Sequence, residues 1–358
     1  CTQPGVTMLY LPTRLMLIVS LSAVFVLTAC GGGDIDSVVP QPGKWQAAHV
    51  GDLLDVTLGD LHPTQGAIGY DQIYYKLGRY EAQPDKKFDD FCADEGLGGL
   101  ASNGYTTQSV LRVSASYTCA TTDVTARDRS ALNPVVIGPN GKTLYVTDGH
   151  HGLSTYYETL DGGPTLHLHV VVKDNLSAYS GDAFWQQMQS RGYMRLKDGN
   201  GQPISAAQLP TQLGLKGGLQ NDPYRALIFF TRNIGYTKPA QAIDYLEFYW
   251  ADWLRAQPDA FSLGNYDRTR LGTTDPDPAT ADTGYLNAVW NASVRMVAAM
   301  DPIIDGKTGA DLGRPDAING EKKYSKGEFN KLSQPMTADK PGKLAYALDY
   351  KARHRLSP

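Results

Sequence analysis

Residues 143–158, TLYVTDGHHGLSTYYE, place one carboxylate and two imidazoles at the end of a predicted strand. Asp148 and Gly149 form a turn signal, and His150 and His151 follow directly. The apolar run before the turn predicts a buried strand, and the residues after it predict a helix. The first turn of a helix presents free backbone N–H groups, which favour an anion such as phosphate. Imidazole and carboxylate groups there can move protons or bind a metal, whereas the simpler interpretation is a turn with solvent-facing histidines.

Several other short segments accompany DGHH. They are LHPTQ at 61–65, NPVV at 133–136, FW at 184–185, LP at 209–210, NDPYR at 221–225 and WADWLR at 250–255. With DGHH, they make the chain resemble the ParB-like nuclease branch of the ParB/sulfiredoxin superfamily over roughly residues 50–256. The resemblance implies a loop at DGHH that handles nucleotide phosphates. Relatives include nucleotide-dependent switches, free-serine kinases and sulfinic-acid reductases, and many have Arg where this chain has Gly152.

Further candidate ligands lie outside DGHH. We expect Gln65 to orient a ligand near DGHH, although a hydrogen bond that stabilises its own turn is the alternative. Arg225, or Arg232 two turns later on the same predicted helix, is expected to reach the pocket and bind phosphate bidentately. The alternative for both arginines is a solvated head group with a packed stem.

A second histidine pair lies on a predicted strand. His167 and His169 are two residues apart, so both side chains point to one face. Together with His150 and His151 they would supply four imidazoles, enough for a transition-metal site. The alternative is a solvent-facing pair, because the residues that alternate with them are apolar and suited to burial.

The N-terminal segment predicts export. Residues 1–29 contain Arg14, an apolar stretch and then Leu-Thr-Ala before Cys30, the pattern of a lipoprotein-type signal peptide. We expect Cys30 to carry lipid and to anchor the protein to a membrane. Gly31 stands where an Asp commonly retains lipoproteins at the inner membrane, which favours an outer-membrane anchor facing the periplasm. The alternatives are an ordinary signal peptide or a membrane anchor, for which the apolar run is short.

The remaining cysteines and the composition fit an exported soluble domain. Cys92 and Cys119 have no metal-ligand spacing, so we predict a disulfide between them rather than two reduced, buried thiols. The apolar content of 42% supports an ordinary core, and the net charge of −4 disfavours general nucleic-acid binding.

The predicted elements indicate an α+β protein, with a small mixed ParB/sulfiredoxin-like sheet and helices followed by a mainly helical subdomain. The predicted organisation is a signal peptide at 1–29, a disordered tether at 30–43, the ParB/sulfiredoxin-like domain at 44–178, the helical subdomain at 179–300 and an irregular tail at 301–358. Within the first domain we expect residues 85–128 to be irregular apart from a strand at 110–117.

Three functions are compatible with these features. The first is a ParB-like nuclease or related phosphate-ester-handling enzyme, with Asp148 and His150 binding a divalent metal such as Mg²⁺ or Mn²⁺ and a histidine acting as acid or base. Its ligand would be a small phosphorylated molecule or nucleic acid. The second is a tethered periplasmic binding module without catalysis. The third is a nucleotide-dependent kinase of a serine-like small molecule, disfavoured by export.

Overall fold

A five-stranded mixed sheet carries the DGHH turn. Its strands are β1 (Leu53–Thr57), β2 (Leu61–Pro63), β4 (Asn133–Ile137), β5 (Leu144–Val146) and β6 (His167–Asn175), in the spatial order β1-β6-β4-β5-β2. The pairs β1–β6 and β4–β5 are antiparallel, whereas β2–β5 and β4–β6 are parallel. A separate two-stranded ladder joins β3 (Ala67–Ile68) to β7 (Gln220–Asn221). Strands β4, β5 and β6 coincide with apolar runs of the sequence, and the predicted α+β class is confirmed.

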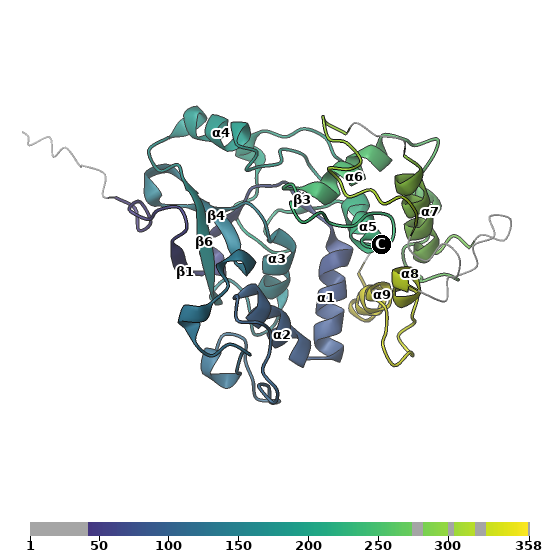
Figure 1. Cartoon of the computed structure of the whole chain (residues 1–358), viewed down its shortest axis with the longest axis horizontal. Helices are drawn as coiled ribbons and strands as arrows, with labels where there is room; N and C mark the ends of the chain where they lie inside the picture. The colour runs from purple at the N-terminus through teal and green to yellow at the C-terminus, as the bar shows by residue number, and fades with distance from the viewer. Residues whose placement is uncertain (1–41, 274–281, 300–303, 319–326, 357–358) are drawn as a thin grey trace, which may run out of the picture. The chain divides into compact units, whose positions relative to one another are not determined.

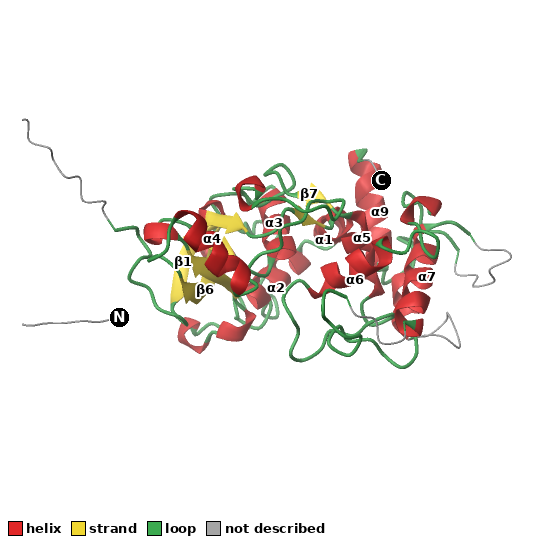
Figure 2. Ribbon diagram, turned by 90° about the horizontal axis from the view of Figure 1, so that it is seen from above, coloured by secondary structure: helices red, strands yellow, loops and turns green. Residues whose placement is uncertain are grey.

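Helices cover both faces of this sheet (Figures 1 and 2). The helices α1 (Tyr70–Ala82), α2 (Asp85–Asp94) and α3 (His150–Glu158) pack on the face that presents Val135, whereas α4 (Gly181–Ser190) packs on the face that presents Val136. Successive residues of a strand point to opposite faces, which explains how neighbouring valines enter different cores.

The remaining helices form a second core. They are α5 (Pro223–Thr231), α6 (Leu246–Arg255), α7 (Tyr285–Ala298), α8 (Gly327–Leu332) and α9 (Lys343–His354). Helix α1 lies between this group and the sheet (Figure 1), because Tyr74 and Tyr75 enter the helical core while Ile73 and Leu77 enter the sheet core. One helix with apolar residues on two sides therefore joins both cores.

The C-terminal segment is more ordered than the sequence indicates. The prediction of an irregular tail at 301–358 is wrong for α8 and α9. Leu344, Ala347 and Leu348 are buried at helical spacing, and α9 approaches α1 so closely that a Cβ at Gly78 would lie 2.5 Å from the carbonyl oxygen of Tyr346. The polar composition around α9 conceals this short apolar stripe.

The segment between α1 and β4 also departs from expectation. Helix α2 occupies part of the region predicted to be irregular, with Phe88 and Phe91 buried. The predicted strand at 110–117 is absent, and a 3₁₀ turn forms at Ser114–Ser116. There the hydroxyls of Ser109 and Ser116 bond to the backbone and compete with strand pairing. The predicted disulfide between Cys92 and Cys119 is confirmed, with a Cα–Cα distance of 5.5 Å.

The computed structural model describes residues 42–273, 282–299, 304–318 and 327–356, all within the unit Pro42–Pro358. The predicted signal peptide, Cys30 and all but the end of the tether lie outside the described residues. Within the described ranges no helix is both long enough and apolar enough to cross a membrane.

Candidate functional site

The DGHH turn is fixed by the conformation of its glycine. Gly149 precedes α3 with a φ of 88°, in the left-handed region. A Cβ at this position would lie 1.7 Å from Oδ1 of Asn133, so a larger residue would strain the backbone and collide with β4. The side chain of Asp148 stays exposed and accepts the N–H of Gly149 at 2.7 Å. The two histidines therefore begin α3 with Asp148 beside them.

Both histidine rings turn inward and hold another segment of the chain. Nε2 of His150 accepts the backbone N–H of Thr64 at 3.1 Å, and Nε2 of His151 accepts that of Gly69 at 2.9 Å. These donors bracket the segment between β2 and α1, which includes Gln65. A neutral ring that accepts at Nε2 carries its proton on Nδ1. The pair thus ties residues 64–69 to the first turn of α3.

Both rings are neutral near pH 7. Burial lowers the pKa of His150 to about 4, against a small opposing effect of the Asp148 charge. Burial also lowers the pKa of His151 well below its ordinary value, and the charge of Arg225 lowers it further. With Nε2 occupied, each ring offers an N–H donor and no free lone pair. This geometry does not suit the predicted role of general base or metal ligand, and it suits binding of an oxygen atom.

A small cavity lies beside these rings. Its volume is about 40 Å³, and it is lined by Gln65, Thr147, Asp148, His150, His151, Arg225, Tyr245, Glu247 and Phe248. We call it the DGHH cavity. One water occupies about 30 Å³ in the liquid, and small-molecule sites span about 300–1,000 Å³. The DGHH cavity can therefore hold one small group, and a whole nucleotide does not fit inside it.

Arg225 brings a buried positive charge to this cavity. Asp222 caps α5 by accepting the backbone N–H of Arg225 at 2.9 Å, which fixes where the side chain begins. One guanidinium nitrogen donates to Gln72 at 3.0 Å, and another lies 3.7 Å from Glu247. Nε of Arg225 is buried and has no hydrogen-bond partner among the residues that the structure describes. Since an unmade hydrogen bond is costly, an acceptor oxygen in the cavity would satisfy this N–H.

Glu247 partly balances that charge. Burial alone would favour its neutral form, but Arg225 and Arg232 outweigh burial and lower the pKa of Glu247 to about 2. The carboxylate is therefore committed to the two arginines, while the exposed Asp148 stands at the cavity with one oxygen uncommitted. The DGHH cavity offers a mixed set of groups, with N–H donors inside and a carboxylate outside.

The structure brings together five of the predicted site residues, with Gly149, also predicted to bind phosphate, in the turn between two of them. Gln65, Asp148, His150, His151 and Arg225 share the DGHH cavity. Gln65 also makes the turn hydrogen bond considered as its alternative role, donating to the carbonyl of Ala67 at 2.7 Å.

Arg232 and Gly152 lie elsewhere. Arg232 pairs with Glu247 and lines a different cavity. Gly152 does not line the DGHH cavity, and a Cβ placed there would lie 3.5 Å from a carboxylate oxygen of Asp94, its one near neighbour among the described residues outside its own helix. A side chain at position 152 would start beside α2, so the Gly at this position removes no group from the cavity wall.

Four lining residues were missed from the sequence, namely Thr147 beside Asp148 and three in an aromatic-rich segment further along the chain, Tyr245, Glu247 and Phe248. Tyr245 has a φ of 61°, and its hydroxyl bonds to Thr64 and to the carbonyl of Tyr193, both at 2.9 Å. Phe248 and Glu247 follow it at the start of α6. The sequence signal that could have found the last three was Glu247, an acid among aromatic residues, because a buried carboxylate requires a partner.

Comparison with known proteins agrees with this core. Residues 54–256 match the family model described as "Putative ParB-like nuclease", which is more than half of the chain. The chain belongs to this family. The matched range covers the sheet, the DGHH turn and α3 through α6.

One solved structure shows a weaker similarity to this ParB-like chain. The crystal structure of protein Atu1540 from Agrobacterium tumefaciens is similar at 20% sequence identity and a TM-score of 0.43, covering 70% of this chain and 92% of that chain. No curated protein matches the chain.

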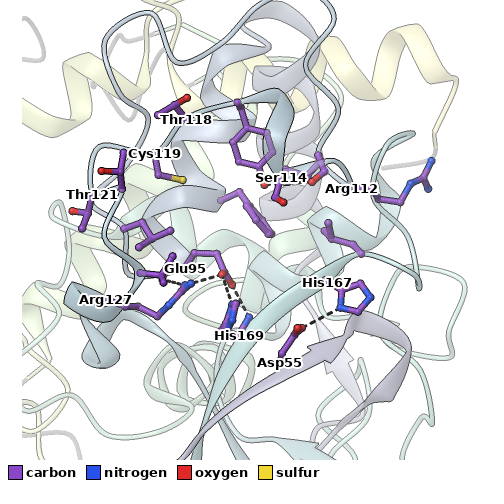
Figure 3. A pocket seen from close by; sticks show the side chains of 17 residues that line it. Asp55, Glu95, Arg112, Ser114, Thr118, Cys119, Thr121, Arg127, His167 and His169 are labelled. Atoms are coloured by element: carbon purple, nitrogen blue, oxygen red, sulfur yellow. Dashed lines mark hydrogen bonds and ion pairs between the residues drawn. The ribbon is translucent and has the colours of Figure 1, made fainter.

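The other histidine pair lies in a larger cavity, which we call the disulfide cavity (Figure 3). It has a volume of about 580 Å³, and Cys119 forms part of its wall. Nδ1 of His169 lies 2.7 Å from Glu95, whose carboxylate also accepts the backbone N–H of His169 and pairs with Arg127. Nδ1 of His167 lies 3.0 Å from Asp55. Each ring thus uses Nδ1, and its Nε2 has no hydrogen-bond partner within the described part of the chain.

The hypothesis that the four histidines form one metal site is wrong. The first pair lies on the core side of the sheet with α3, whereas His167 and His169 alternate with the buried residues of β6 and point the other way. The DGHH and disulfide cavities share no lining residue. In the ranges that the structure describes, no three His, Cys, Asp or Glu side chains are grouped as a metal site requires.

Proposed function

We propose that this ParB-like chain binds a phosphate ester at the DGHH cavity and hydrolyses it, as a nuclease or related phosphodiesterase. The supporting observation is that residues able to donate N–H groups line one small buried space, which an oxygen of a phosphoryl group can enter. Those donors come from Arg225, the two neutral imidazoles and the start of α3. The sugar or chain attached to the phosphate would remain outside, so the substrate would lie across the cavity mouth.

Each group then has a role in hydrolysis. Arg225 and the imidazole N–H groups would hold the phosphoryl oxygens and stabilise the charge that develops on them. Asp148, exposed beside the cavity, would orient a water molecule for attack on phosphorus. The water oxygen bonds to phosphorus and the ester P–O bond breaks. Asp148 takes the proton from the attacking water and releases it to solvent, and the alkoxide, which departs on the opposite side of phosphorus at the open mouth of the cavity, takes a proton from solvent.

A divalent ion, Mg²⁺ or Mn²⁺, is part of the proposal as a partner of the substrate and has no preformed site of its own. Asp148 is the one uncommitted carboxylate lining the DGHH cavity, since Glu247 is held by two arginines. His150 uses its Nε2 on the backbone of Thr64. These residues do not form a metal cage, so any ion would depend on substrate oxygens and water for its remaining ligands.

A non-catalytic receptor is the second candidate, because both Nε2 atoms are already occupied by backbone N–H groups. A site of fixed donors can bind a phosphorylated ligand without transferring protons. The nucleotide-dependent kinase gains no support, since a cavity of about 40 Å³ cannot enclose a nucleotide.

Hydrolysis assays on the full chain distinguish the two candidates. Bis(p-nitrophenyl) phosphate and a single-stranded oligonucleotide would be tested with Mg²⁺, Mn²⁺ or EDTA, and phosphate binding would be measured by calorimetry. We expect Asp148→Asn to lower the rate at least 100-fold and to leave phosphate binding intact. Asp123→Asn, at another exposed aspartate, should change neither. Binding without turnover in the wild type would favour the receptor, and the absence of both would refute the site.

We also propose that the protein is exported and held by lipid on Cys30. The disulfide supports this location, because structural disulfides persist in oxidising compartments. Cys30→Ser should move the protein from the membrane fraction to the soluble fraction, since an acyl anchor would be lost. Retention of that variant on salt-washed membranes would contradict the lipid anchor.

A further inference from the structure

A third cavity, which we call the basic cavity, is lined by residues at the end of α5, on α8 and at the start of α9. Its volume is about 370 Å³, within the range of about 300–1,000 Å³ typical of small-molecule sites. Apolar side chains form part of the wall, namely Phe230, Ile234, Leu332 and Pro341. It shares no lining residue with the DGHH cavity.

Four cationic side chains line the basic cavity, against one lining carboxylate. Arg232 is balanced by the buried Glu247, and Lys331 is paired with Glu328 at 2.6 Å. Lys340 and Lys343 have no carboxylate partner within the described part of the chain. Since Glu247 also pairs with Arg225, the described residues leave an excess of positive charge at the basic cavity, carried most directly by Lys340 and Lys343.

Lys343 shows that these charges affect one another. Its ammonium lies 5.1 Å from the centre of the Phe229 ring. Desolvation lowers the pKa of Lys343, and repulsion from Arg232, Arg79 and Lys331 lowers it further, while Glu328 alone opposes them. An isolated surface lysine would be solvated and unperturbed. The first turn of α9, which has no side-chain cap, adds partial positive charge at the same place.

We propose that the basic cavity binds the dianionic group of a small organic molecule, either a phosphate monoester or a dicarboxylate. Two negative charges match the two uncompensated lysines, and the apolar wall receives the carbon skeleton of the ligand. A monoanion would leave one lysine uncompensated, and an inorganic dianion would leave the apolar wall unused. The site is independent of the proposed hydrolysis because it lies in a separate cavity.

Amine labelling of the full chain with a competing ligand tests this site directly. Phenyl phosphate and phenylsuccinate would each be added before acetic anhydride, with benzoate as the monoanionic control, and labelling of each lysine would be read by mass spectrometry. We expect Lys343 and Lys340 to be protected at least 5-fold by one of the two dianions and by less than 2-fold by benzoate. Lys142, exposed on the β4–β5 connection, serves as the unprotected reference.

The two dianions distinguish the two ligand classes, and the lysine variants test whether the ligand binds in the basic cavity. Protection by phenyl phosphate alone identifies phosphate monoesters, and protection by phenylsuccinate alone identifies dicarboxylates. Lys340→Gln and Lys343→Gln should each weaken calorimetric binding of the protective ligand at least 10-fold, whereas Lys142→Gln should not. Equal labelling with and without both dianions at 10 mM, or binding unchanged in the two variants, overturns the proposal. Because Asp148 does not line this cavity, the effect of Asp148→Asn on hydrolysis is measured separately from this result.

Discussion

The histidine pair at the start of α3 and the pair on β6 differ in which ring nitrogen the protein occupies. His150 and His151 are 3% and 8% exposed, and each accepts a backbone N–H at Nε2. His167 and His169 are partly or largely exposed, and each directs Nδ1 at a carboxylate. Backbone N–H groups hold the rings of the first pair at Nε2. Side-chain carboxylates orient the rings of the second pair and leave Nε2 available.

The ring nitrogen that is occupied decides whether a histidine mainly stabilises the fold or remains able to react. A buried imidazole that satisfies a backbone donor contributes mainly to stability, because losing it leaves an N–H unpaired. An imidazole oriented by a carboxylate and open at Nε2 has the arrangement of catalytic and metal-binding histidines. In this protein the two histidines of the DGHH motif are of the first, structural kind. His167 and His169, which lie outside that motif, are of the second kind, with Nε2 open.

The largest expected effect is on the buried pair. His151→Ala should lower the free energy of unfolding by about 4 kcal/mol, since it leaves the N–H of Gly69 unpaired and opens a cavity. His167→Ala, on the exposed face, should change it by less than about 0.5 kcal/mol. Urea titrations of both variants measure the difference. Equal losses would show that burial does not distinguish the two pairs.

The disulfide should stabilise the region around the open pair. Cys92 and Cys119 are 27 residues apart, and closing a loop of that length contributes about 3.5 kcal/mol in the chain-entropy model. The Cys92→Ser/Cys119→Ser double variant should therefore unfold at lower urea concentration. Hydrogen exchange should rise first in residues 95–127 and not in α3. Faster exchange in α3 as well would show that the two regions unfold together.

Acidification should destabilise the protein through the buried pair. The ordinary pKa of histidine is about 6.5, and His150 in the folded protein has a pKa of about 4, so the unfolded chain binds more protons between these values. This contribution to stability is complete above pH 6.5 and falls by about 3 kcal/mol as the pH drops to 4. Comparing wild type with His150→Asn from pH 8 to 4 isolates it.

Much of the fold follows from sequence patterns that involve neighbouring residues. The alternation in β6 and the apolar runs of β4 and β5 predict buried strands, and Asp222 before Pro223 predicts the start of α5. The pairing of Cys92 with Cys119 follows from elimination and compartment. Each of these inferences depends on information within a few residues or on composition.

The site depends on contacts that local patterns do not contain. The acceptors at His150 and His151 are fixed by donors more than 80 residues earlier, at Thr64 and Gly69. Tyr245 reaches the same cavity from a left-handed backbone conformation that no glycine marks. The direction of Arg232 is likewise set by Glu247. Tertiary pairing of charged and polar groups decides which residues of a motif face a cavity.

The smallest expected effect concerns the carboxylate that orients His169. Glu95→Gln keeps the size of the side chain but removes the charge that pairs with Arg127 and one acceptor position for His169. We expect a loss of about 1 kcal/mol, because the amide oxygen still accepts one of these bonds. The sharper measurement is the ring tautomer by ¹⁵N NMR. His169 should carry its proton on Nδ1 in the wild type and become a mixture of tautomers in Glu95→Gln, while His150 stays unchanged since Thr64 holds its Nε2. A wild-type His169 protonated on Nε2 would mean that Glu95 does not orient the ring, and the contrast between the two histidine pairs would then fail.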